Sequence, residues 1–133
     1  MRTFLIAVTV FTFSTAAFSF GEPKHSKVEV TSSESDKEIS FNLKVIPNEE
    51  LKITHDAPWN LTIKNEQGIA FANSKFVKAD MDGKLPGYKI SSKSKPTSKA
   101  GSFDYKLVSF VCTKDKTSCY REVHKGTHKW TSK

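Results

Sequence analysis

Apolar and polar residues alternate strictly in the stretch between residues 39 and 45. Every odd position there is apolar and every even position is polar: Ile39, Ser40, Phe41, Asn42, Leu43, Lys44 and Val45. A period of two is typical of a β-strand with one face on a core and the other face in solvent. Pro47 and Asn48 end the run. The strongest periodic signal in this chain therefore predicts a strand.

Shorter strand-like runs and turn-forming clusters fill most of the remaining chain. The runs cover residues 28–30, 51–53, 59–63, 88–90 and 103–112, and the turn clusters include residues 65–68 and 91–99. No segment shows the period of 3.6 residues, with caps, that marks a helix of normal length. Short strands separated by turns predict an all-β fold, specifically an immunoglobulin-like antiparallel β-sandwich over residues 28–126.

The first nineteen residues have the pattern of a cleaved secretory signal peptide. A positively charged start, Met1-Arg2-Thr3, precedes an apolar run over residues 4–13 and small residues up to Ser19. We expect a signal peptide at 1–19, a short tether at 20–27 and a basic tail at 127–133. The apolar run is too short to span a bilayer and no later run is longer, so no membrane span is expected. This pattern predicts a periplasmic or secreted protein.

The basic charge of the chain gives little support to nucleic-acid binding. The formal net charge is +7, but the lysines are scattered along the sequence and Arg121 is the single arginine after the signal peptide. An arginine-rich stripe interleaved with stacking aromatic residues is absent from the sequence. We therefore interpret the lysines as a solvated surface with weak attraction to anions, and expect a monomer with no nucleic-acid partner.

The two cysteines of the chain, Cys112 and Cys119, flank six polar residues between two strand-like runs. An antiparallel hairpin would place Cys112 opposite Cys119, and the same register pairs Phe110 with Arg121 and Val108 with Val123. Export favours a disulfide between the two sulfurs, because such bonds persist outside the cytosol.

Three roles for this pair follow from the residues. As a structural clip, the bond closes an eight-residue loop and stabilises the fold by roughly 2.5 kcal/mol in the chain-entropy model. As an exchangeable bond, it would use the nearby Lys114, Lys116 and Arg121 to stabilise a thiolate. The residues alone favour the clip.

A metal site is the third role, and it would add His124 and His128 to the cysteines. The two histidines have the spacing H-x3-H, but the six residues between the cysteines make a wider arm than zinc sites use. Export also favours oxidised cysteines over free metal ligands. We therefore predict no metal and no cofactor.

Two further positions give predictions about the core. The apolar parity changes between Leu107 and Val108, which indicates either a β-bulge near Leu107 or a strand buried on both faces. Trp59 shares the parity of Leu61 and Ile63, so we expect it in the core.

Several of these features resemble the amino-terminal periplasmic domain of the thiol:disulfide interchange protein DsbD family. The resemblance rests on the segment Ala57-Pro58-Trp59-Asn60-Leu61, the final long strand over residues 107–112 and the second cysteine just across the turn. It spans roughly residues 28–124, but its specific part is the terminal strand with the cysteine hairpin.

The resemblance implies an immunoglobulin-like domain that takes part in thiol–disulfide exchange. Cys112 and Cys119 would then be the catalytic pair, and the partners would be periplasmic or membrane thiol–disulfide proteins. Three features differ from the family pattern: the C-x6-C spacing is longer, Tyr120-Arg121-Glu122 stands where a proline-rich segment is expected, and the chain has no membrane electron-transfer domain. The alternative is a non-catalytic binding module with a structural disulfide.

Overall fold

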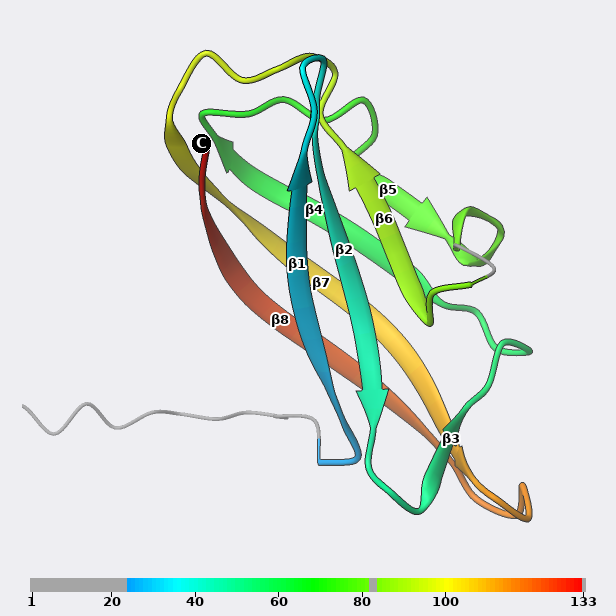
Figure 1. The fold of residues 1–133 in the computed structure, drawn as a ribbon. Coiled ribbons are helices and arrows are strands. Elements are labelled where there is room, and N and C mark those ends of the chain that lie inside the picture. Colours follow the sequence, from blue (N-terminus) through cyan, green and yellow to red (C-terminus); the bar gives the residue numbers. More distant parts are fainter. Residues whose placement is uncertain (1–23, 82–83, 133) are drawn as a thin grey trace, which may run out of the picture.

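The computed structural model describes residues 24–81 and 84–132, and the predicted signal peptide at 1–19 lies outside them. The described chain consists almost entirely of antiparallel strands, with one short 3-10 helix, η1 (Lys78–Asp80). Two sheets pack face to face as a sandwich (Figure 1). The prediction of an all-β antiparallel sandwich is confirmed.

The first sheet has three strands and the second has five. In the first sheet the order is β1 (Ser26–Glu34), β2 (Ile39–Pro47) and β6 (Gly87–Ser91). In the second sheet, β7 (Ala100–Thr113) pairs along one edge with β8 (Cys119–Thr131) and along the other with β3 (Leu51–Ile53) and β4 (Asn60–Gln67), and β4 pairs in turn with β5 (Lys75–Val77). The long β7–β8 hairpin crosses behind β1 and β2 (Figure 1).

The core lies between the sheets and is built from the alternating residues of β2. Its four apolar side chains, Ile39, Phe41, Leu43 and Val45, are each at most 1% exposed. They pack with side chains of the second sheet, including Leu61 and Leu107. Burying a side chain of this size contributes about 1.5–3 kcal/mol relative to leaving it in water, so this strand anchors the sandwich.

Aromatic rings fill the end of the core where β7 begins. Phe41 contacts Phe103 with ring centroids 5.0 Å apart, and both rings contact the imidazole of His128 at 5.5–5.6 Å. Trp59 is 1% exposed, as its parity predicts.

The carboxyl-terminal segment differs from the prediction. A basic tail was expected at 127–133, but β8 continues to Thr131 and pairs with β7 as far as the start of that strand. Trp130 is only 4% exposed and belongs to the core. The tail prediction is therefore wrong for residues 127–131. Lysine and threonine on the solvent face of β8 give this segment a polar sequence, and Trp130 is its one large buried side chain. The tether at 20–27 is also too long, since β1 begins at Ser26.

The parity change in β7 results from burial on both faces. Leu107 and Val108 are both at most 2% exposed. The register between β7 and β8 is continuous, and the irregularity lies in β4, between Lys64 and Gln67, where Asn65 has a φ of 54°. No helix in the described part of the chain has the length and apolarity needed to cross a membrane.

Candidate functional site: a disulfide at the end of the β7–β8 hairpin

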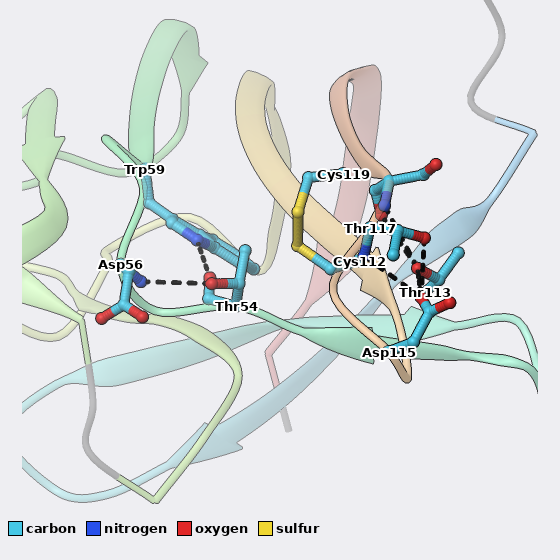
Figure 2. The surroundings of a disulfide bond; sticks show 9 residues. Thr54, Asp56, Trp59, Cys112, Thr113, Asp115, Thr117 and Cys119 are labelled. Atoms are coloured by element: carbon cyan, nitrogen blue, oxygen red, sulfur yellow. Dashed lines mark hydrogen bonds between the residues drawn. A yellow bond between two sulfur atoms is a disulfide. The ribbon is translucent and has the colours of Figure 1, made fainter.

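Cys112 and Cys119 form a disulfide where β7 ends and β8 begins (Figure 2). The register is the one that the sequence predicts: Cys112 lies opposite Cys119, Phe110 opposite Arg121 and Val108 opposite Val123. The two Cα atoms are 4.0 Å apart. Both the hairpin and the bond are confirmed.

The two halves of the bond differ in exposure. Cys112 is on a central strand, flanked by Lys52 of β3 on one side and Cys119 of β8 on the other, and it is only 5% exposed. Cys119 begins an edge strand and is an exposed residue. An incoming thiolate can therefore reach the Cys119 half more easily than the Cys112 half.

Hydrogen bonds close the turn beyond the disulfide. Asp115 Oδ1 accepts bonds from Thr113 Oγ1 at 2.5 Å, from the Thr117 amide at 3.1 Å and from Thr117 Oγ1 at 2.8 Å (Figure 2). The Thr113 amide also donates to the Ser118 carbonyl at 2.9 Å. The side-chain bond from Thr113 and the bonds from Thr117 lower the pKa of Asp115, so its carboxylate stays charged and keeps accepting them. This turn has its own constraints, independent of the sulfur–sulfur bond.

The connection between β3 and β4 gives the site a fixed neighbour. The Thr54 amide donates to the Phe110 carbonyl at 3.2 Å, and Trp59 Nε1 donates to the Thr54 carbonyl at 2.6 Å. His55 stacks on Trp59 with ring centroids 6.4 Å apart. The buried indole therefore holds this connection against the strand that carries Cys112.

Basic residues surround the disulfide. The sequence predicted Lys114, Lys116 and Arg121 as its neighbours, and all three are exposed, the first two in the turn and the third on β8. The structure adds Lys52, which is directly opposite Cys112 in the sheet. No local pattern could have identified Lys52, because its position depends on the pairing of β3 with a strand far along the chain.

The two histidines lie on the other face of the hairpin. His124 and His128 are opposite the core residues Leu107 and Phe103, whereas Cys119 has the opposite parity on β8. The four residues of the metal alternative are therefore not brought together. Within residues 24–81 and 84–132, no group of three or more histidine, cysteine or acidic side chains is placed to hold a metal ion.

A buried polar cluster on this face was not predicted from the sequence. Its members are Ser26 of β1, Ser109 of β7 and Glu122 and His124 of β8, each at most 6% exposed. His124 Nε2 lies 3.2 Å from Ser26 Oγ and 2.9 Å from Ser109 Oγ. The Ser26 hydroxyl donates to Glu122 Oε1, and the Lys24 and His25 amides donate to Glu122 Oε2 at 2.9 and 3.0 Å.

This cluster attaches the start of β1 to β8 and is not arranged as a hydrolytic triad. In a triad the carboxylate orients the histidine, whereas here Glu122 accepts from Ser26 and from two backbone amides. Burial lowers the pKa of His124, and the charge of Glu122 opposes that effect in part. The predicted hairpin register already places Ser109, Glu122 and His124 on one face, but Ser26 is too distant in sequence to be included.

An open groove lies beside the hairpin, where the β2–β3 turn meets the amino-terminal segment. Its lining includes His25, Glu49, Glu50, Asp115 and Tyr120, and His25 stacks on Tyr120 with ring centroids 3.9 Å apart. Neither cysteine lines this groove, so it is not an entrance to the disulfide.

No family model, curated protein or solved structure matches the chain. The fold and the site themselves define it as an antiparallel β-sandwich whose last hairpin carries a disulfide with one exposed and one buried cysteine.

Proposed function

We propose that the chain is an exported thiol–disulfide exchange domain that acts through Cys112 and Cys119. The observation that carries the proposal is the unequal exposure of the pair, with Cys112 5% exposed and Cys119 exposed. A relay needs one sulfur that partners can reach and a second that stays protected until it resolves the mixed disulfide. The resemblance to the interchange-protein family supports the same role.

The exposures assign an order to the two sulfurs. In the reduced domain, the Cys119 thiolate attacks an acceptor disulfide, forms a mixed disulfide and expels the other acceptor thiolate. The Cys112 thiolate then attacks the Cys119 sulfur and expels the second acceptor thiolate. The acceptor gains two electrons and its thiolates take up two protons, while the domain is left with the Cys112–Cys119 bond.

The hairpin supports this cycle because it does not depend on the bond. β7 and β8 are paired from Ala100 to the cysteines, and the Asp115 network holds the turn beyond them. Opening the disulfide therefore leaves the two thiols close together. The cations of the site, Lys52 and Arg121 among them, favour thiolate over thiol.

The reduction potential of the pair is the first test. We expect equilibrium with glutathione buffers, at a potential above about −300 mV, because structural disulfides usually lie below that value. A pair that glutathione cannot reduce would support the alternative of a binding module with a structural clip.

Single-cysteine variants test the order of attack. Cys112→Ala keeps the exposed sulfur and should accumulate mixed disulfides with disulfide-containing partners, while Cys119→Ala keeps only the buried sulfur and serves as the matched control. Both variants lack the clip, so loss of the disulfide alone cannot account for a difference between them. Equal trapping by both, or by neither, would contradict the assignment.

A further inference from the structure

Three neighbouring rows of side chains cross the solvent face of the second sheet, and we call them the basic face. The register gives the rows as Lys75, Thr62, Lys106 and Lys125; then Lys64, Asp104 and Thr127; then Gln67, Ser102 and Lys129. Glu66 lies in the bulge between the second row and the third. The five lysines come from four strands, with β4 and β5 close in sequence to each other but distant from the β7–β8 hairpin.

These rows hold much of the net charge of the protein. All five lysines are exposed, and Asp104 is the single acidic residue in the rows. The other described residues, Glu66 included, comprise fourteen lysines and arginines and eleven acidic residues. Five of the lysines that appear scattered along the sequence are therefore brought together by the fold on one face.

Lys64 lies directly opposite Asp104, but the other four lysines have no acidic residue opposite them in the register. Lys106 is directly opposite Lys125, and like charges at opposed positions destabilise a sheet. Asp104 accepts hydrogen bonds from Asn65 Nδ2 at 2.8 Å and from Thr127 Oγ1 at 2.5 Å. Among the described residues, none of the five lysines forms an ion pair. An anionic surface brought against this face would relieve the repulsion.

An exposed apolar side chain borders the basic face. Val77 of β5 is 58% exposed and is the one large apolar residue of the described chain with such exposure. It is paired with Asn60, in the row next to Lys75 and Lys106. Lysines beside an exposed aliphatic side chain are suited to the boundary between lipid headgroups and acyl chains.

We propose that the basic face binds the surface of a bilayer containing anionic phospholipids. Adjacent strands are about 4.8 Å apart, and successive outward residues of one strand are about 6.8 Å apart, so the lysines form a two-dimensional array of point charges. Such an array matches anions spread over a plane. A single-stranded nucleic acid instead needs several stacking aromatic side chains along a groove; the three rows contain none, and Tyr105 is the single aromatic residue lining the hollow between Lys64, Lys106 and Lys125.

The attachment is electrostatic and does not depend on the disulfide chemistry proposed above. Each lysine held near an anionic bilayer strengthens binding by roughly fivefold. Because the face is solvent-exposed, salt screens the attraction, and binding should weaken steeply as ionic strength rises.

Vesicle co-sedimentation tests the proposal, using the mature chain (residues 20–133) so that the apolar run of the signal peptide does not insert on its own. We expect binding to vesicles of equal parts phosphatidylglycerol and phosphatidylcholine, and none to phosphatidylcholine alone. Lys106→Glu with Lys125→Glu should weaken binding at least roughly 25-fold. Lys37→Glu with Lys89→Glu changes the net charge by the same amount on exposed residues outside the basic face and should have a much smaller effect.

Three outcomes would overturn the proposal. Equal binding to both vesicle types would show that the anionic lipid is irrelevant, and equal losses in the two double variants would show that net charge, and not this face, governs binding. Binding to duplex DNA or heparin that needs Lys106 and Lys125, without binding to anionic vesicles, would assign the face to a linear polyanion instead. Circular dichroism of each variant establishes that it is folded.

Discussion

At the scale of single residues, His124 makes the stability of the fold depend on pH. Burial lowers the pKa of this imidazole from its ordinary value of 6.5, and burial lowers the pKa of His128 in the same direction. As pH falls through 6.5, the unfolded chain takes up protons that the folded chain still resists. The stabilisation that comes from keeping His124 and His128 neutral is therefore complete above pH 6.5. It is lost as the pH falls toward the lowered pKa values of the two buried imidazoles.

We expect the free energy of unfolding to decrease between pH 7 and pH 5, and His124→Gln to flatten that dependence. One histidine contributes at most about 1.4 kcal/mol per pH unit. Urea unfolding at several pH values measures the slope. If the pH dependence of the free energy of unfolding is unchanged in His124→Gln, this histidine does not resist protonation. The variant His128→Gln then measures how much of the pH dependence comes from His128.

Single residues were predicted best where local register decides their position. The partners of Cys112, Phe110 and Val108 follow from one hairpin and one turn length, so the sequence was sufficient. The contacts of Ser26 with Glu122 and His124 in the buried polar cluster were not predictable, because they depend on how the two sheets pack.

At the scale of elements, two glycines set how closely strands approach. A Cβ at Gly87 of β6 would lie 1.8 Å from the Leu43 carbonyl oxygen of β2, which is backbone and cannot move without shifting the strand. A Cβ at Gly126 of β8 would lie 2.7 Å from Tyr105 Oη, which belongs to a partly buried side chain and not to the backbone. The same substitution therefore meets backbone at one site and a side chain at the other, and a side chain can shift at lower cost than a paired strand.

We expect Gly87→Ala to lower the free energy of unfolding by about 3 kcal/mol, and Gly126→Ala by only about 1 kcal/mol. Denaturant unfolding of the two variants at one pH gives the comparison, and each serves as the other's control because the added group is identical. A larger loss at Gly126 would indicate that the Tyr105 ring has no alternative position.

Strands with strong alternation were predictable as elements, and strands with a polar majority were not. β2 follows directly from residues 39–45, whereas β8 beyond residue 126 has few apolar residues and was mistaken for a tail. Its pairing with β7 and the burial of Trp130 are tertiary effects that no local window contains.

At the scale of the whole molecule, the collection of charge on one face should reduce stability in low salt. Replacing both Lys106 and Lys125 with glutamine removes the like-charge contact and should raise the free energy of unfolding by about 0.2–1 kcal/mol. The gain should shrink at high ionic strength, where salt already screens the repulsion. Unfolding curves of the wild type and the double variant at two salt concentrations measure this, and a gain independent of salt would point to a cause other than charge.

The attachment of β1 to β8 also affects the folding rate of the chain. The β7–β8 hairpin needs only a short turn, so it can form early, but the Ser26–Glu122 contact joins residues 96 positions apart. Contacts of such separation are slow to form, and β-sandwiches dominated by them fold in milliseconds to seconds. The amino-terminal end of β1 is therefore expected to join the structure last, and until it does, the carboxylate of Glu122 remains open to water.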